Sequence, residues 1–318
     1  MQENIINVDK ISKTFLNKNA EKKAIDSVSF KIKSGEITGY IGKNGAGKST
    51  MIKILCGILT PSCGKATVKG ITPYKNRIKN AQNIGAVFGQ RTQLWWDLPL
   101  IDSYNILRKI YKVGKRDFEN RLDYFDHAFN ISKLFKSLVR TLSLGERMKA
   151  DIVASMLHNP SVLFLDEPTI GLDYYSKKSM RKVIKDLNSN FGTTIVITTH
   201  DMQDIEQLCE RVIIVDKGAK LYDDTLRNLK ERFGTHKHIK IKNMDQEDAA
   251  ILLRKLDLPE TNYIYDYKKN ILELSLDNSM NKSSLQTLLN IIFLFCSPND
   301  ITVKDDDIES IIERIHIK

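Results

Sequence analysis

The stretch GKNGAGKST, from Gly42 to Thr50, decides the fold of this chain. It follows EITGYI, a short apolar run that is partly β-branched, and it precedes STMIKILCGIL, in which apolar residues recur at helical spacing. The expected order is therefore strand, glycine-rich turn and helix. This context, together with the fit to the pattern GxxxxGK[ST], predicts a loop that binds phosphate groups.

The residue types in this loop suit phosphate chemistry. Glycine lets backbone N–H groups converge on phosphate oxygens, and the start of the following helix adds partial positive charge. A lysine adds a full charge, and a serine hydroxyl is a ligand for Mg²⁺. The expected phosphate site consists of Gly42, Lys43, Asn44, Gly45, Ala46, Gly47, Lys48, Ser49 and Thr50.

Two later apolar runs end in polar residues. SVLFLDEP ends with Asp166 and Glu167, and TTIVITTHD ends near His200; both indicate buried parallel strands with helical stretches between them. This alternation predicts an α/β fold whose ligand site lies at the carboxyl edge of the sheet. Alone, adjacent acids after a strand more often form a solvated turn. Beside a phosphate loop, they favour metal-assisted phosphoryl transfer.

A third stretch, TLSLGERMKAD, begins at Thr141 and places Ser143 and Gly145 at the start of a helix. This is a second anion-binding terminus, which the chain's own phosphate loop does not need. Here the sequence resembles the ATP-binding cassette (ABC) family, whose LSGGQ signature appears as LSLGE, with Leu144 for glycine and Glu146 for glutamine. GKNGAGKST, VFGQ, LSLGE, LFLDEPT, GLD and TTHD follow the family order over roughly the first 235 residues.

The resemblance implies distinct roles for several residues of one chain in binding ATP and Mg²⁺ and in hydrolysis. Lys48 and the loop amides would hold the β- and γ-phosphates, and Ser49 and Gln90 would bind Mg²⁺. Gln90 would also take part in catalysis by contacting the attacking water. Asp166 would reach the metal through water. Glu167 would be the general base that activates the attacking water.

The resemblance also assigns residues outside the phosphate loop and the acidic strand end. His200 would sense the γ-phosphate, and Phe15 would stack on adenine. Ser143 and Gly145 would close over the ATP held by a second subunit, and Asp173 would link the two sites. One cassette per chain therefore implies a head-to-tail dimer, either of identical chains or with a sibling ATPase.

The fold implied for residues 1–235 is an ABC ATP-binding domain, with a RecA-like P-loop core, an N-terminal antiparallel β part and a helical insertion near residues 94–139. Residues 236–318 indicate a small α+β domain with an accessory or regulatory role. Its expected order of strand, helix, hairpin, helix, strand and helix comes from KHIKIK, EDAAILLRKL, YIYDYKKNILELSL, SSLQTLLNIIFLF, DITVK and DIESIIERI.

Composition narrows the class of protein. The chain has 318 residues, of which 42% are hydrophobic and 28% charged, typical of a globular protein rather than a disordered or fibrous one. Apolar runs such as IIFLF are much shorter than the roughly 20 residues of a membrane-spanning helix, and no secretory signal is visible.

Four cysteines form no CxxC pair, so neither a zinc site nor a disulfide framework is indicated. The net charge of +10 comes from lysines spread before His236, so we expect no direct binding of nucleic acid.

The stretch that follows Gln90, RTQLWWDLPLIDSYNILRKIY, indicates the branch of the family. It resembles ATPases that pair with separate integral membrane permease subunits of the ABC-2 exporter type. Adjacent Trp95 and Trp96 cannot both face one side of an element, so at least one is expected at the surface or a partner interface.

The function implied is an ATP-hydrolysing exporter subunit in the cytoplasm, peripheral on the inner face of the cell membrane. Two alternatives stay open at this point. One is a soluble cassette protein that acts on ribosomes or nucleic acid, which the basic charge suits. The other is an importer ATPase whose C-terminal domain regulates transport.

Overall fold

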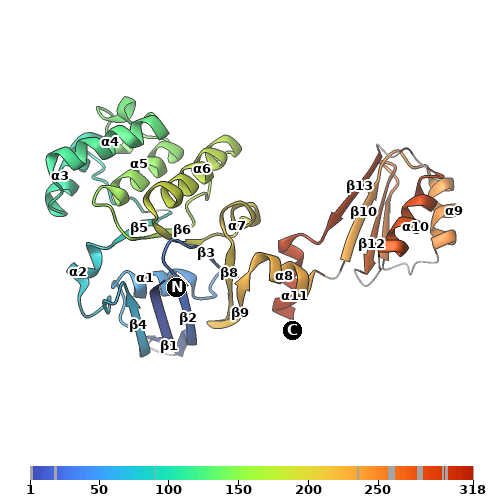
Figure 1. The fold of residues 1–318 in the computed structure, drawn as a ribbon, viewed down its shortest axis with the longest axis horizontal. Coiled ribbons are helices and arrows are strands. Elements are labelled where there is room, and N and C mark those ends of the chain that lie inside the picture. Colours follow the sequence, from blue (N-terminus) through green and yellow to red (C-terminus); the bar gives the residue numbers. More distant parts are fainter. Residues whose placement is uncertain are drawn as a thin grey trace. The chain divides into compact units, whose positions relative to one another are not determined.

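The computed structural model describes residues 3–17, 20–89, 91–234, 236–256, 262–277, 282–295, 297 and 300–317. The chain forms two compact units, residues 1–226 (unit 1) and 227–318 (unit 2) (Figure 1). The domain boundary expected between residues 235 and 236 falls after α8 (Leu226–Phe233) and stays a prediction.

A six-stranded sheet forms the centre of unit 1. All its strands are parallel except β9, which pairs antiparallel with β8. The five parallel strands are apolar and mostly buried on both faces, as expected of a parallel sheet covered by helices, whereas the edge strand β9 is largely exposed. This confirms the predicted α/β core. In spatial order the strands are β5 (Ile84–Phe88), β6 (Val162–Asp166), β7 (Thr194–Thr198), β3 (Ile37–Ile41), β8 (Arg211–Asp216) and β9 (Ala219–Thr225).

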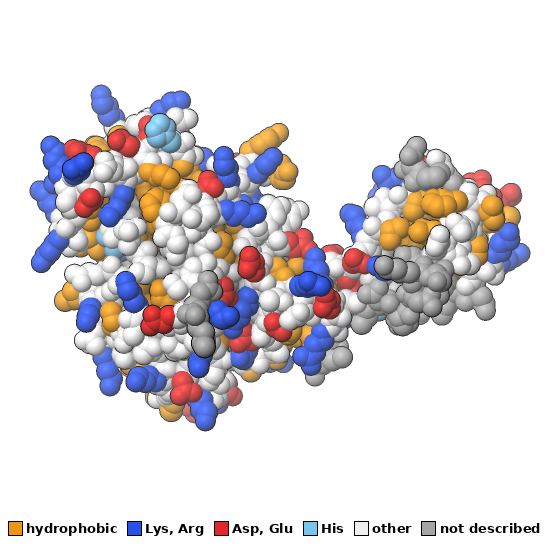
Figure 2. All heavy atoms as spheres, viewed as in Figure 1, with side chains coloured by type: hydrophobic (Ala, Val, Ile, Leu, Met, Phe, Trp, Pro, Cys, Tyr) orange, Lys and Arg blue, Asp and Glu red, His pale blue; other side chains and the backbone are white. Residues whose placement is uncertain are grey.

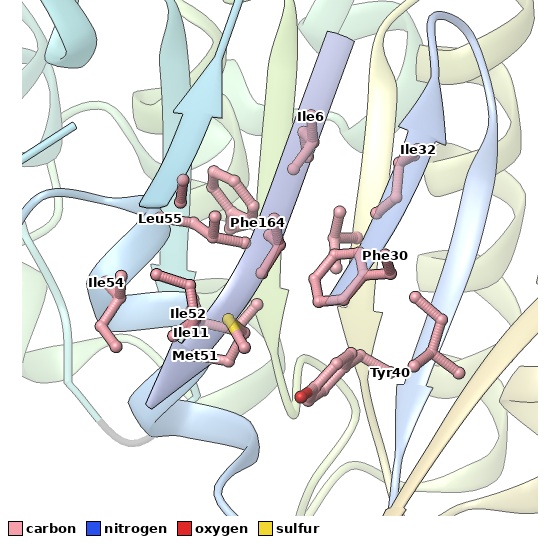
Figure 3. Close-up of a cluster of buried hydrophobic side chains, with 14 of the residues drawn as sticks. Ile6, Ile11, Phe30, Ile32, Tyr40, Met51, Ile52, Ile54, Leu55 and Phe164 are labelled. Atoms are coloured by element: carbon pink, nitrogen blue, oxygen red, sulfur yellow. The ribbon is translucent and has the colours of Figure 1, made fainter. Parts of the chain in front are cut away.

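The predicted antiparallel part is a three-stranded sheet of β2 (Ala20–Lys33), β1 (Asn4–Asn17) and β4 (Cys63–Val68), in that order. It packs with helix α1 (Lys48–Leu55) and the central sheet around one buried cluster. Figure 3 shows that Ile6 and Phe30 of this sheet, Met51 of α1 and Phe164 of β6 contribute to that cluster. The core therefore fixes α1, and with it the phosphate loop, against the carboxyl end of β6.

The expected insertion between β5 and β6 is helical, which confirms that prediction. Its helix α4 places Phe118, Leu122, Phe125 and Phe129 on one buried stripe, at the spacing of an amphipathic helix. On the face shown in Figure 2, Lys and Arg side chains of unit 1 are interspersed with Asp and Glu. The remaining helices of unit 1 are α2 (Arg77–Ala81), α3 (Leu100–Ile110), α4 (Lys115–Phe129), η1 (Ile131–Leu134), η2 (Val139–Thr141), α5 (Leu144–Met156), α6 (Tyr174–Phe191) and α7 (Met202–Leu208).

Unit 2 contains a four-stranded antiparallel sheet with two helices packed on one face. The element order matches the predicted strand, helix, hairpin, helix, strand and helix, which confirms it. The first six elements form the βαββαβ arrangement known from ferredoxin-like folds. The strands are, in spatial order, β11 (Tyr263–Asp266), β12 (Ile271–Asp277), β10 (His236–Ile241) and β13 (Ile301–Asp305). Helices α9 (Gln246–Leu256) and α10 (Lys282–Ile292) complete the six, and α11 (Ile308–Ile317) follows them.

Candidate functional site

The phosphate loop turns sharply between β3 and α1. Gly47, directly before α1, has a φ of 101°, a left-handed conformation that favours glycine. A Cβ atom there would lie 2.4 Å from the carbonyl oxygen of Ala24, and one on Gly42 would lie 2.1 Å from that of Val215. The loop therefore needs glycine at both positions, because neighbouring backbone occupies the space of a side chain.

Lys48, the first residue of α1, is buried beside this loop. Its Nζ donates hydrogen bonds to the carbonyl oxygens of Gly42 at 2.7 Å and Lys43 at 3.1 Å. Burial lowers the pKa of Lys48, and the charges of Glu167 and Asp166 oppose that effect. The ammonium group is thus held at the mouth of the loop, between it and the two acids.

Ser49 and Asp166 meet at the carboxyl end of β6. Ser49 Oγ donates to Asp166 Oδ1 at 3.2 Å, and Thr198 Oγ1 at the end of β7 donates to the same oxygen at 2.5 Å. In the described residues, no three His, Cys, Asp or Glu side chains are arranged to hold a metal. A hydroxyl beside one carboxylate nevertheless fits Mg²⁺, which usually binds proteins through few oxygen ligands plus substrate phosphates.

Glu167 has an unusual backbone conformation for a residue with a side chain. Its φ is 55°, and its N–H donates to the carbonyl oxygen of Thr198 at 2.9 Å and to its hydroxyl at 3.1 Å. Its carboxylate Oε2 lies 3.3 Å from Nδ1 of His200. The structure therefore brings together the expected general base and the expected sensor of the γ-phosphate.

Two cavities adjoin these residues. One of about 540 Å³ is lined by Phe15, Lys48 and other loop residues, and also by Glu167. The second, of about 370 Å³, is lined by Ser49, Asp166 and Glu167. Phe15 is 40% exposed, so its ring is accessible at the edge of the first cavity. Each volume lies in the range of small-molecule sites.

Gln90, the other expected metal ligand, lies outside the described residues. The residue before it is held close to the acids, because the N–H of Gly89 donates to the carbonyl oxygen of Asp166 at 2.8 Å. A Cβ atom on Gly89 would approach the carbonyl oxygen of Glu167 to 2.7 Å. The strand that leads to Gln90 thus runs directly beside β6.

Ser143, Gly145 and Asp173 lie together at a different place from the phosphate loop. Ser143 caps α5 in a reciprocal capping box with Glu146, and Asp173 caps α6 through the N–H of Ser176 at 3.0 Å. A Cβ atom on Gly145 would lie 3.2 Å from Oγ of Ser176, so the two helix starts are neighbours. None of the three residues lines either cavity at the phosphate loop.

Comparison with known proteins agrees with this geometry. The sequence profile described as ABC transporter matches residues 25–170. The bacitracin transport ATP-binding protein BcrA of Bacillus licheniformis is 32% identical over 234 residues, which cover 74% of each chain. The daunorubicin resistance ATP-binding protein DrrA3 of Streptomyces coeruleorubidus is 29% identical over 285 residues, covering 89% of this chain and 87% of that protein.

A solved structure shares the fold. A dimeric ATP-binding cassette in a post-hydrolysis state, with ADP and phosphate bound, superposes with a TM-score of 0.63 at 25% identity. It covers 70% of this chain and 99% of that one. The chain belongs to the ABC transporter family.

As a family member, this cassette is the subunit of an ABC transporter that binds and hydrolyses ATP. It has the P-loop NTPase fold expected from its motifs. Across the described segments of the cassette chain, no helix combines the length and apolar character needed to cross a bilayer.

Sequence reasoning missed a buried polar cluster beneath the acids of the cassette. Asp204 on α7 is fully buried, and it accepts hydrogen bonds from the hydroxyls of Thr169 and Thr199. Nε of Arg181 on α6 donates to the other carboxylate oxygen of Asp204 at 2.5 Å. Asp204 thus ties the segment after Glu167 to the segment before His200 and to α6. In the sequence, the only indication of a role for Asp204 was its position in the helix that follows TTHD.

A second missed residue is Asp151 on α5, which holds the segment after Gln90. Its Oδ1 accepts from the hydroxyl of Thr92 at 2.8 Å and from the N–H of Gln93 at 3.1 Å. Burial raises the pKa of Asp151 to about 6, although these hydrogen bonds and Arg147 act in the opposite direction. The signature helix is therefore joined directly to the loop that leads to the two tryptophans.

Proposed function

We propose that the cassette hydrolyses Mg²⁺–ATP at the phosphate loop and powers an exporter built from separate membrane subunits. The observation that carries the proposal is a meeting of residues from three separate segments beside the loop. Lys48, Ser49, Asp166 and Glu167 line the cavities there, and His200 contacts Glu167. These are the donors, metal ligands and base that phosphoryl transfer to water requires.

In this mechanism, Lys48 and the loop amides hold the β- and γ-phosphates, and Phe15 stacks on adenine. Ser49, Gln90 and Asp166 would hold Mg²⁺, which neutralises phosphate charge when bound. Glu167 accepts a proton from the attacking water as that water bonds to the γ-phosphorus. Its left-handed backbone fixes the direction of the carboxylate toward the cavity, since the N–H is already bonded to Thr198.

His200 is the group that links binding of the γ-phosphate to the general base, Glu167. Its ring contacts Glu167, and 59% of its side chain is exposed. A γ-phosphate offers Nδ1 or Nε2 a charged acceptor, so binding ATP moves the imidazole and frees the carboxylate for water.

We also propose that two cassettes pair head to tail. Ser143, Gly145 and Asp173 lie away from the cassette's own phosphate loop, so they are free to close over the ATP of a partner. A dimeric solved cassette with a similar fold supports this arrangement. The chain's partner is an identical copy or a sibling ATPase.

The exporter role rests on the relatives and on one surface. BcrA and DrrA3 are named for bacitracin transport and daunorubicin resistance. Trp95 and Trp96 are 38% and 50% exposed, which confirms that at least one lies at the surface. They follow Gln90 in sequence and are anchored through Asp151, so a permease docked there would be linked to the nucleotide site. In this proposal the cassette lies peripherally on the inner face of the cell membrane, and residues 236–318 act as an accessory domain.

The test of the ATPase site is Glu167→Gln, with Glu210→Gln as a matched control on an exposed glutamate. We expect Glu167→Gln to bind ATP, to lose turnover by roughly a thousand-fold or more, and to accumulate as a dimer in light scattering. The control should turn over normally. A Glu167→Gln variant that stays monomeric at saturating ATP would contradict the shared site.

The test of the exporter role is a pull-down of tagged cassette from detergent-solubilised membranes, with partners identified by mass spectrometry. A multi-span permease should co-purify. A Trp95→Ala, Trp96→Ala double variant should lose it, while Leu221→Ala, which truncates another exposed apolar residue, should retain it. Ribosomal or DNA-associated partners without a permease would overturn the exporter role and leave the ATP chemistry in place.

A further inference from the structure

The sheet of unit 2 has two different faces. Figure 1 shows α9 and α10 together on one side of the sheet, where Ile239 and Ile241 of β10 are fully buried. Because side chains alternate along a strand, His238 and Lys240 point to the opposite face. Lys242, just after β10, continues this alternation. The central strand therefore presents a row of basic groups.

This second face is hollow. A cavity of about 630 Å³ lies on it, within the roughly 300–1,000 Å³ of small-molecule sites. The register of the β10–β13 pairing places Lys304 of β13 opposite His238, and Thr302 opposite Lys240. Ser275 of β12 lies opposite His238 on the other side. Lysine ammonium groups and hydroxyls thus line the same cavity.

The cavity keeps unneutralised positive charge. Lys240 pairs with Glu273 at 2.5 Å, and His238 bonds to Asp306 at 2.9 Å. In the described part of the chain, the side chains of Lys242 and Lys304 form no ion pair. From residue 236 onward acidic residues outnumber basic ones, yet the cavity is lined by Lys240, Lys242 and Lys304 and, among its described lining residues, by one acid, Glu273. Such segregation favours an anionic ligand.

We propose that this cavity binds a soluble small molecule that carries a phosphate group. Lysine binds phosphate as a compact point charge, and Ser275 and Thr302 supply hydroxyl donors beside it. The site lies in unit 2 and is distinct from the ATP site of unit 1.

Two macromolecular occupants fit the face less well. Single-stranded nucleic acid is usually held by aromatic rings on which bases stack, but Tyr263 at this cavity packs against the apolar core of unit 2. An anionic membrane usually attracts a cluster of about four to eight basic residues. This face has fewer lysines, and they surround a hollow that a flat bilayer would not fill.

Methyl NMR on the full-length protein tests the proposal. Ile264 lines the cavity and is 70% exposed, so its δ-methyl signal, assigned with Ile264→Val, reports occupancy. The protein is saturated with Mg²⁺–ADP, so that the phosphate loop is filled, and titrated with ribose 5-phosphate and with pyrophosphate. We expect a saturable shift of the Ile264 signal at millimolar concentration with at least one of the two probes. Lys242→Gln and Lys304→Gln should each weaken binding about five-fold.

Matched controls give each outcome a meaning. Lys268→Gln with Lys269→Gln removes two lysines of the same unit that do not line the cavity, and binding should persist. No saturable shift with either probe, or an equal response to ribose, would overturn the proposal. Equal loss in the Lys268, Lys269 variant would show non-specific attraction, and a shift only with phosphatidylglycerol vesicles would show a membrane surface; either result also overturns it.

Discussion

Thr169 and Thr199 donate their hydroxyls to the same carboxylate oxygen, Oδ2 of Asp204. Thr169 lies two residues after Glu167, and Thr199 directly precedes His200, so one buried acid fixes the spacing of the base and the sensor. Arg181 neutralises that acid from α6. Thr169, Thr199 and Asp204 do not line either cavity at the phosphate loop, so these are positioning residues.

The first prediction concerns this shared acceptor. Thr169→Val and Thr199→Val each remove one hydroxyl while keeping the side-chain shape, and neither leaves Arg181 without its carboxylate. We expect kcat to fall roughly ten-fold, because small displacements of catalytic groups are costly, with KM nearly unchanged since the phosphate loop is untouched. Steady-state ATPase kinetics measure both quantities.

Thr193→Val is the control for those two variants. Thr193 is equally buried, but its hydroxyl has no hydrogen-bond partner among the residues that the structure describes. Its kcat and stability should match the unmodified protein. If all three variants lost turnover equally, loss of a buried hydroxyl in general, and not the link to Asp204, would explain the effect.

The second prediction concerns the raised pKa of Asp151. The folded protein keeps this proton up to about pH 6, whereas an unfolded chain releases it near 3.8. The free energy of unfolding should therefore fall as pH rises through this window and level off above it. Relative to Asp151→Asn, the protein should lose about 1 kcal/mol between about pH 5 and 7.

Urea denaturation of both proteins across that range measures the difference. Asp123→Asn removes an exposed carboxylate from the helical insertion and should show no such trend. A constant difference between the protein and Asp151→Asn at every pH would mean that the pKa of Asp151 is not raised.

The third prediction compares two glycines of the phosphate loop. Gly47→Ala adds a Cβ atom against Ala24 and forces a left-handed φ, whereas Gly45→Ala, at a φ of 82°, meets nothing within 4 Å. Gly45→Ala should cost about 1 kcal/mol of unfolding free energy and retain ATP affinity. Gly47→Ala should cost more and weaken ATP binding at least ten-fold, because the loop amides must move. Thermal unfolding and equilibrium nucleotide binding measure these effects. Equal stability and equal ATP affinity of the two variants would contradict this loop geometry.

The fourth prediction separates capping from catalysis at the start of α5. Ser143 and Glu146 form one capping box, so Ser143→Ala and Glu146→Ala should each destabilise the helix by about 1 kcal/mol. Only Ser143→Ala should abolish most ATP turnover, since its hydroxyl is proposed to contact the partner's nucleotide. Both variants should bind ATP as well as the unmodified protein. Equal turnover in the two variants would show that the Ser143 hydroxyl does not contact the partner's nucleotide.

Much of the fold was predictable because its signals are local. The family resemblance indicated the helical insertion near residues 94–139, and apolar runs of five or six residues indicated the strands of the central sheet. The elements of unit 2 followed in the same way. The strand β4 and its pairing with β1 were not predicted, because an exposed start, Cys63 to Lys65, hides its alternation.

The sequence by itself determined the phosphate loop and the identity of the candidate site residues, since each motif is a short stretch whose chemistry is complete within it. Only the tertiary structure decided which of them meet. Asp166 lies beside Thr198 because β6 pairs with β7, and that pairing also brings Glu167 to His200. Sheet order depends on contacts between residues far apart in the chain, so no local pattern could reveal Asp204 beneath both segments or the basic cavity of unit 2.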